Sequence, residues 1–370
     1  MSPEQIEIQM IAMLVASACA LPGVFLVLRH MAMMSDAISH SILPGIVIAF
    51  FLTHNLSSPL LIAAAAATGV ATVALVEVVH RTRLVREDAA IGLVFPFLFS
   101  IGVLLIARYA GDVHLDVDAV LLGAIEFATF DRMSWGGLDL GPKALYTMGT
   151  VLLLNASFIV LFYKELKIST FDAGLAAALG FAPVALHYVL MGFVSVTAVA
   201  AFDAVGSILV VALMVGPAAA AHLLTDRLPA MLAWSIGIAL ISAESGYWLA
   251  HWLDASTAGA MATMVGVLFG GIFLFAPERG LLSRMRLRSE QRWTFARKML
   301  TVHLLHHEGL PEEARESRVA HLQEHLRWEA GFATRAVRSA AQLGLVVERD
   351  GSLQLTDKGR EHAQESVVHG

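Results

Sequence analysis

Residues 194–213 read VSVTAVAAFDAVGSILVVAL, and this stretch decides what kind of fold the chain can adopt. Asp203 is its one ionisable side chain. Helices of about 20 apolar residues are long enough to cross the hydrocarbon core of a bilayer. The stretch therefore predicts membrane-spanning helices, with one carboxylate held at membrane depth just before Gly206.

Similar apolar stretches follow one another through residues 8–276, and they dominate the composition. Of the 370 residues, 57% are hydrophobic and only 15% are charged, with a mean hydropathy of +0.69. Soluble globular proteins carry about 25% charged residues. The composition excludes a single soluble core and a disordered chain. Cys19 is the only cysteine, which excludes disulfides within the chain and thiolate metal clusters.

Hydropathy predicts an all-α polytopic membrane protein with eight or nine transmembrane helices. Pro and Gly interrupt several of them, as at Pro44-Gly45, Pro96 and Gly216-Pro217. Broken or re-entrant helices survive at membrane depth only where protein or a water-filled cavity satisfies the freed backbone groups. The spans are expected near residues 8–28, 38–54, 60–79, 89–107, 143–163, 183–203, 205–224, 230–251 and 257–276.

Lys and Arg at the span ends predict the orientation, because short cytoplasmic loops are enriched in both. Basic residues gather at 80–86, at Lys164 and Lys167, at Arg227 and at 279–288. These segments are expected to be cytoplasmic, with an external N-terminus and a cytoplasmic C-terminal domain. We therefore expect a multi-pass protein of the cell (inner) membrane.

Asp36 and His40 are the most informative polar pair, four residues apart and next to Pro44-Gly45. A helix would place both on one face. Ionisable residues inside a membrane are costly and mark functional sites, and a carboxylate with an imidazole suits Mn, Fe or Zn. The alternative is that Asp36 caps a helix while His40 satisfies backbone groups.

Four further carboxylates are candidates for a metal pathway. Asp116 and Asp118 lie in the expected external segment 111–142, whose apolar part 117–127 could dip back into the membrane. Acidic side chains at a pore mouth concentrate cations. Asp203 and Glu244 are candidates because of their expected depth in the membrane. The alternatives are a solvated loop and a glutamate hydrogen-bonded to a neighbouring helix.

The segment from Phe171 to Gly180 connects two spans on the expected cytoplasmic side. It predicts a short Ala-rich helix ended by Gly180, with Phe171, Asp172 and Leu179 beside or within it. A short helix lying along the membrane surface suits docking into a groove of another protein. A simple connector is the alternative.

The composition changes after Pro277, and we expect two domains, a transmembrane domain at 1–282 and a small α+β domain at 283–370. Helices are expected at 290–308, 312–328 and 332–343. The alternating segments on either side of Asp350-Gly351 predict a β-hairpin. Helices followed by a hairpin and a closing helix indicate a winged-helix-like cytoplasmic domain.

Three roles remain open for this tail. Residues 290–370 carry eleven Lys or Arg and twelve Asp or Glu, a balance that disfavours DNA binding, although Arg335 and Arg338 lie on the expected recognition helix. Closely spaced histidines predict metal sensing, since paired His at helical spacing can bind Zn. The third role is a solvated helical face in a domain that packs against partner subunits. The histidines are His303, His306, His307, His321 and His325.

Four stretches in order, covering residues 8 to about 282, resemble ABC-type manganese/zinc/iron permeases. These are Arg29–Gly45, Glu87–Gly92, Phe202–Pro217 and Ser256–Pro277. The resemblance implies a homo- or heterodimeric membrane core, two cytoplasmic ATPases and an external metal-binding solute-binding protein. It also implies that metal passes Asp36, His40 and Asp118 and that residues 171–180 form the ATPase-coupling segment. The tail resembles metal-dependent manganese/iron repressors.

The sequence thus predicts a permease subunit that imports divalent metal, with the metal as substrate and no tightly bound cofactor. No Walker motif occurs in the chain, so ATP hydrolysis is expected on a separate subunit and this chain is not expected to be an enzyme. Nucleic acid is not expected as a partner. One alternative is a membrane-tethered, metal-responsive regulator whose tail binds DNA. Another is an ATP-independent channel or carrier.

Overall fold

The computed structural model describes residues 2–54, 58–109, 125–135, 138–319, 321–322, 326–349 and 351–368. The chain divides into two compact units, Met1–Gly280 and Leu281–Gly370. We call the first the membrane unit and the second the tail unit, and we describe each separately.

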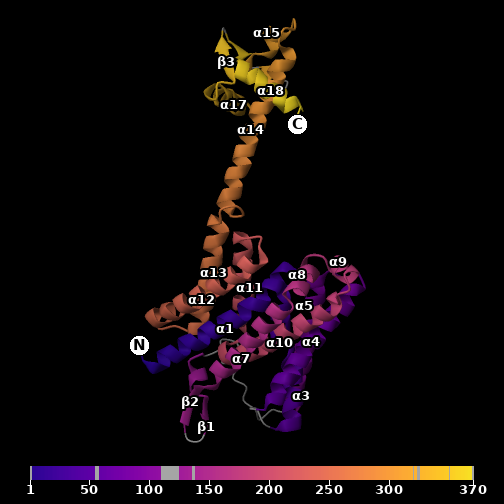
Figure 1. Ribbon diagram of the computed structural model, residues 1–370, viewed down its shortest axis with the longest axis vertical. Coiled ribbons are helices and arrows are strands. Elements are labelled where there is room, and N and C mark those ends of the chain that lie inside the picture. The colour runs from indigo at the N-terminus through magenta and orange to yellow at the C-terminus, as the bar shows by residue number, and fades with distance from the viewer. Residues whose placement is uncertain are drawn as a thin grey trace. The chain divides into compact units, whose positions relative to one another are not determined.

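The membrane unit is built of long apolar helices (Figure 1), as the hydropathy predicts. Within the described residues, nine spans are long and apolar enough to cross a membrane, with α2 and α3 together forming one of them. The helices are α1 (Pro3–Leu28), α2 (Met33–Ser41), α3 (Leu43–Thr53), α4 (Pro59–Arg81), α5 (Glu87–Tyr109), α7 (Lys143–Leu161), α10 (Pro183–Val205), α11 (Ser207–Leu224), α12 (Leu228–Leu253) and α13 (Thr257–Phe275).

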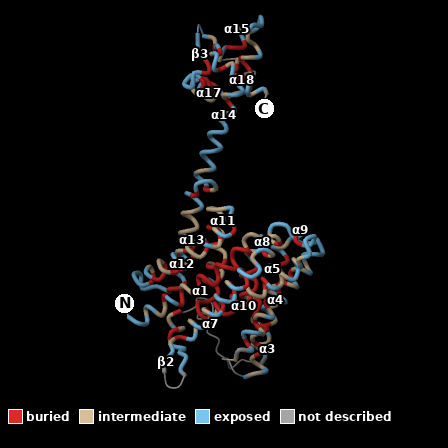
Figure 2. Tube along the Cα trace, in the orientation of Figure 1, coloured by how far each residue is buried: buried red, intermediate tan, exposed pale blue. Residues whose placement is uncertain are grey.

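Helix α1 forms the centre of the membrane unit. It packs against α7, α10, α11 and α12, and Figure 2 shows buried residues gathered along it. Its large side chains Ile11, Phe25 and Leu26 are fully buried. A Cβ atom on Gly23 would lie 2.0 Å from the carbonyl oxygen of Met214 on α11. Small residues of this kind let membrane helices approach closely.

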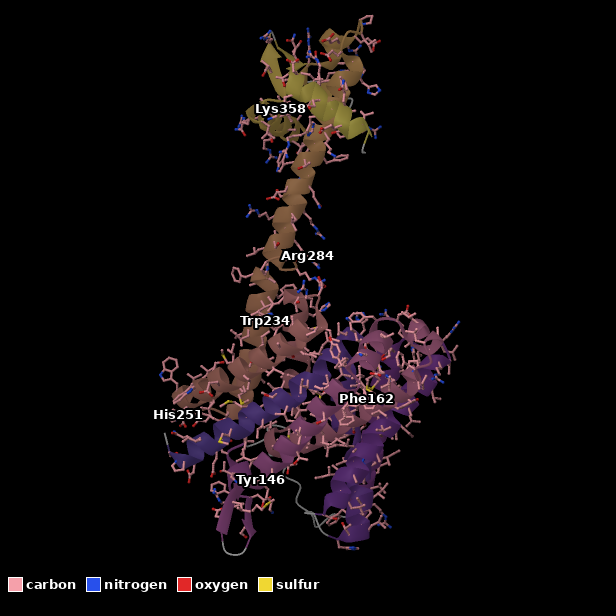
Figure 3. The ribbon with its side chains drawn as sticks, viewed as in Figure 1. Tyr146, Phe162, Trp234, His251, Arg284 and Lys358 are labelled. Atoms are coloured by element: carbon pink, nitrogen blue, oxygen red, sulfur yellow. The ribbon has the colours of Figure 1, made fainter. Side chains whose placement is uncertain are left out.

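The outer surface of the membrane unit is apolar. Large side chains such as Val160, Leu161 and Trp234 are exposed on α7 and α12, and side chains project from the helices in Figure 3. Soluble monomers rarely expose continuous apolar surface of this extent. Such a surface is stable against lipid chains, which supports a membrane setting for these helices.

A short hairpin lies between α5 and α7. A 3₁₀ turn, η1 (Phe127–Thr129), precedes strands β1 (Arg132–Trp135) and β2 (Leu138–Pro142), which pair antiparallel with Ser134 opposite Asp139. The Arg132 guanidinium contacts Glu7 of α1 at 2.9 Å and Asp139 at 2.5 Å. This hairpin was not expected from the sequence. The expected re-entrant stretch 117–127 falls mostly outside the described residues.

The tail unit surrounds a small apolar core that includes Leu300, Leu304, Val346 and Leu353. The hairpin expected around Asp350-Gly351 is present, with Val346 opposite Leu355. Helix α14 begins earlier than the sequence predicts and packs against α17 and α18. The elements are α14 (Leu281–His307), α15 (Glu313–Glu316), α17 (Ala330–Gln342), β3 (Val346–Arg349), β4 (Ser352–Leu355) and α18 (Asp357–Val368).

The prediction of one helix over 312–328 is wrong, because α15 ends at Glu316. The backbone carbonyl of Ser317 accepts a hydrogen bond from the N–H of Leu353 on β4 at 2.9 Å. The Ser317 hydroxyl also bonds to the Glu313 carbonyl. Contacts with the hairpin therefore replace the helical hydrogen bonds that the local sequence would otherwise make.

Candidate metal pathway and coupling elements

The span that carries the candidate metal pair is broken in the middle. Helix α2 ends at Ser41 and α3 begins at Leu43, with Ile42 in a turn between them. Pro44 lies in the first turn of α3, where its missing N–H is tolerated but would not be in the interior of a continuous helix. The predicted break is therefore present, and it falls just before the proline.

Glycine follows Pro44 because α3 and α4 approach closely there. A Cβ atom on Gly45 would lie 2.1 Å from the Thr68 hydroxyl and 2.6 Å from the Ala64 carbonyl oxygen. The second atom belongs to the backbone of α4, which has little freedom to move aside. Gly45 thus fixes the position of α3 directly after the break.

Asp36 and His40 lie on one face of α2, as the four-residue spacing predicts. His40 Nε2 is 3.5 Å from Asp36 Oδ1, and the side chains are 29% and 38% exposed, respectively. One metal ion bonded to both atoms at about 2.1 Å would hold them about 3.0–3.4 Å apart, close to the distance found. The pair can therefore act as two ligands to one ion after a small side-chain adjustment.

Asp36 is not a helix cap. The N-cap position of α2 is Ala32, which makes no side-chain capping bond, and Asp36 is the fourth residue of the helix. The carboxylate therefore lies in the first turn of α2 but caps no backbone N–H there. The centroid of the His40 ring lies 6.1 Å from that of Phe95 and 6.4 Å from that of Phe99, both on α5.

Hydroxyl side chains hold α2 in place behind this pair. Ser39 bonds to the Ser35 carbonyl at 2.9 Å, and Ser35 bonds to the Ala32 carbonyl at 3.0 Å. Ser41 and Thr72 on α4 share a hydroxyl–hydroxyl hydrogen bond of 2.7 Å. All three serines are buried. Ser35 and Ser39 bond to backbone carbonyls of their own or the preceding turn, whereas the Ser41 bond joins α2 to α4.

The other predicted metal residues are placed separately. Asp116 and Asp118 fall outside the described residues. For Asp203 only the backbone is described, and it lies near the end of α10, a helix that packs against α2. Glu244 accepts a hydrogen bond of 2.8 Å from Trp248 Nε1 on its own helix, α12, which packs mainly against α1, α11 and α13. Among the predicted metal residues whose side chains are described, Asp36 and His40 are the pair brought together.

The predicted coupling segment forms two short helices, α8 (Tyr163–Phe171) and α9 (Ala173–Ala178). Asp172 caps α9, its carboxylate accepting the Leu175 N–H at 2.8 Å, and Gly180 ends the segment with φ of +86°. Phe171, Leu175 and Leu179 are 61%, 50% and 57% exposed. These three residues form an apolar coupling surface that suits contact with another protein.

Arg29 is a further candidate that sequence reasoning did not single out as a site. It caps the end of α1, before α2. Its guanidinium contacts Thr170 at 3.2 Å and Ser169 at 3.1 Å on α8, and His187 on α10 at 3.3 Å. Burial lowers the pKa of Arg29, yet guanidinium stays protonated in proteins. One half-buried cation thus joins the α1–α2 connection to the coupling segment.

The one sequence feature that pointed to Arg29 was its position at the start of the stretch 29–45. Its partners lie 140 to 158 residues away in the sequence. Contacts of that separation depend on the packing of α8 and α10 beside α1 and leave no local pattern.

Comparisons with known proteins agree with this architecture. The sequence profile of the ABC 3 transport family matches residues 5–276. The zinc transport system membrane protein TroD of Treponema pallidum is 47% identical over 358 residues, covering 97% of each chain. The manganese transport system membrane protein MntD of Bacillus subtilis is 49% identical over 271 residues, covering 73% of this chain and 92% of its own.

A solved structure is similar in fold. PsaBC from Streptococcus pneumoniae, solved in complex with Fab, matches with a TM-score of 0.62 and 25% identity, covering 75% of this chain and 94% of its own. The profile match spans the whole bundle from α1 to α13, including the broken α2–α3 span and the coupling segment. The chain belongs to the ABC 3 transport family.

Proposed function

We propose that this chain is the membrane-spanning subunit of an ATP-binding-cassette importer for a divalent transition metal ion, Zn, Mn or Fe. Family membership supports the permease role, and the similar proteins named for zinc and manganese transport support the substrate class. The observation that carries the proposal is the Asp36–His40 pair beside a broken helix. Carboxylate and imidazole are ligands that all three metals accept.

The pair on α2 suits passage of an ion better than storage. Two protein ligands leave coordination positions open, because closed structural sites for zinc supply four. Water or a second permease subunit would fill these positions. Asp116 and Asp118 would receive the ion from an external solute-binding protein, and Asp203 and Glu244 are further candidates for the path. No resident cofactor is part of this scheme.

Transport would be driven by separate cytoplasmic ATPases docked on the coupling surface of Phe171, Leu175 and Leu179. Exposed apolar side chains on a short capped helix support such docking. Arg29 would transmit movement of α8 to α2 through its contacts with Ser169 and Thr170. The chain itself would hydrolyse no nucleotide.

Basic residues at the ends of α4, around α8 and after α13 support a cytoplasmic position for the coupling surface and for the tail unit. In the described part of the tail unit, helices α14, α15 and α17 are followed by a hairpin and then by α18, an order that supports a winged-helix-like domain. We retain that fold as part of the proposal.

Cellular metal content tests the proposed function. Cells lacking this chain should hold less of one of the three metals when external metal is scarce, and the intact chain should restore the content. Chains with Asp36→Asn or His40→Gln should fail to restore it, although they reach the membrane in normal amounts. Glu4→Gln and His80→Gln, which change exposed side chains of the same types, serve as controls. Full restoration by both α2 variants would refute the site assignment.

A further inference from the structure

Three imidazoles and one carboxylate converge in the tail unit. His303 and His307 are one turn apart on α14, and Glu316 is the last residue of α15. One ligand atom from each of these three residues lies within 4.8 Å of the other two. His321 Nε2 lies 2.8 Å from Glu316 Oε2, and His303 Nε2 lies 3.8 Å from the same oxygen.

The cluster is largely buried. The side chains of His303, Glu316 and His321 are only 6%, 10% and 13% exposed. A carboxylate removed from water is unfavourable unless a cation or hydrogen bonds compensate it. His321 Nε2, 2.8 Å from the Glu316 carboxylate, already compensates part of this charge. A divalent cation held between the imidazoles and the carboxylate would compensate it further.

Contacts made by residues outside the cluster hold these side chains together. Because the Ser317 carbonyl bonds to Leu353 on β4, the chain leaves the helix directly after Glu316. Leu322, next to His321, is fully buried in the core that also holds Leu304 of α14. The ligands are therefore carried by packed elements, which is what a precise binding site needs.

A backbone carbonyl helps to fix the His303 ring. Nε2 lies 3.2 Å from the backbone carbonyl oxygen of Glu316, and it is the same nitrogen that lies 3.8 Å from Glu316 Oε2. Metal-binding histidines commonly hold their ring with a bond from one nitrogen to a carbonyl and bind the metal through the other, so Nδ1 would be the ligand atom of His303. The rings of His303 and His307 are 4.8 Å apart between centroids.

We propose that His303, His307, Glu316 and His321 form a zinc-type metal site in the tail unit. Four ligands at about 2.1 Å from a tetrahedral ion lie about 3.4 Å apart, and the observed spacings of 2.8, 3.8 and up to 4.8 Å lie on either side of that value. Imidazole-rich sites favour Zn²⁺ over Mn²⁺, which prefers oxygen ligands. The site lies in a different unit from Asp36 and His40 and goes beyond the proposed transport function.

Metal binding to the purified full-length chain tests this site. The chain carries Asp36→Asn throughout, so that the pathway pair contributes no carboxylate ligand. Metal-free protein is dialysed against ZnCl₂ or MnCl₂, and bound metal is counted by mass spectrometry. We expect the parent to bind one Zn²⁺ more per chain than chains that also carry Glu316→Gln or His321→Ala. We expect the parent to bind Mn²⁺ at this site at least tenfold more weakly than Zn²⁺.

His306→Ala is the matched control, because His306 is an exposed residue on the same helix. It should retain the additional zinc, and zinc should raise its thermal unfolding temperature but not that of Glu316→Gln. Zinc-edge X-ray absorption of the parent should show about three imidazole ligands, independently of whether any variant folds. Equal zinc binding by Glu316→Gln, His321→Ala and His306→Ala, or a spectrum without imidazole, would overturn the site. Cellular metal uptake by the wild-type chain is measured separately, so either proposal can fail alone.

Discussion

Asp36 and His40 lie on a helix that belongs to an expected membrane span, and the energetics of the membrane make that placement informative. A carboxylate costs about 2.5–3.5 kcal/mol at the centre of a membrane helix on insertion scales, and Asp36 is the fourth residue of its span. Asp36 caps no helix. The basic side chain beside it is His40, whose Nε2 lies 3.5 Å from Asp36 Oδ1. A cation bound between the two side chains would offset this free-energy cost. The helical repeat keeps both ligands on the same face, and the Ser41–Thr72 hydrogen bond joins α2 to α4 beside them.

Arg29 gives a prediction about coupling. Arg29→Ala removes the guanidinium that contacts Ser169, Thr170 and His187. Hydrogen bonds to charged groups contribute about 1.5–3 kcal/mol each, so we expect a lower unfolding temperature. We also expect less metal transported per ATP hydrolysed. Both quantities can be measured on the transporter reconstituted with its ATPase.

Arg29→Lys is the informative comparison for this prediction. Lysine keeps the charge but lacks the planar fork that reaches several partners at once, so it should fall between the wild type and alanine. The linking role is refuted if Arg29→Ala transports as many ions per ATP as the wild type does.

At the scale of helices, the sequence predicts the membrane unit well, because hydropathy over about 20 residues is what makes a span. All nine expected spans coincide with helices to within a few residues. The break near Pro44 was predictable for an equally local reason, the missing N–H of proline. The position of Asp36 and His40 on one helix face was predictable because residues four apart lie on the same side of a helix.

Features that depend on distant contacts were not predictable. The end of α15 at Glu316 depends on a backbone hydrogen bond from Leu353, so a continuous helix over 312–328 was expected instead. The same break brings His321 to Glu316, whereas the sequence grouped His321 with His325, which falls outside the described residues. The hairpin β1–β2 is joined to α1 by Arg132 and Glu7, another pairing with no local signal.

The coupling surface gives a prediction at the scale of one element. Leu179→Glu places a charge on a side chain that is 57% exposed, so the stability of the chain should change by no more than about 0.5 kcal/mol. Association with the ATPase should weaken and metal uptake should fall at least tenfold. Co-purification of the ATPase and uptake by vesicles are the measurements.

Phe130→Glu is the control for this variant. Phe130 is also exposed, but it lies before α7, at the end of that helix opposite to α8. It should leave ATPase association unchanged. If Leu179→Glu retains the ATPase as well as Phe130→Glu does, the coupling surface is assigned wrongly.

For the whole molecule, the family profile covers one of the two units. It matches residues 5–276, which lie within the membrane unit. The match to TroD covers 97% of this chain and so extends over most of the tail unit, whereas the match to MntD covers 92% of that protein and 73% of this chain. The membrane unit should hold the parts needed for transport, and the tail unit should add to them.

Truncation after Gly280 tests this division. The boundary preserves Arg279, which contacts the His222 carbonyl at 3.0 Å and also pairs with Asp226. We expect the shortened chain to insert, bind its ATPase and import metal within about twofold of the full chain, while losing the zinc bound by the tail unit. A shortened chain that reaches the membrane and binds ATPase but imports nothing would show that the tail is part of the transport machinery.

The central claim is that Asp36 and His40 carry the transported ion, and uptake by purified, reconstituted transporter tests it most directly. Vesicles containing this chain, its ATPase and the solute-binding protein are supplied with ATP and radiolabelled zinc or manganese. Because even outer-sphere partners of a metal change affinity or activity by about 10- to 100-fold when mutated, Asp36→Asn and His40→Gln should each lower uptake at least tenfold while ATP hydrolysis continues. Uptake within twofold of the wild type for both variants would contradict the claim.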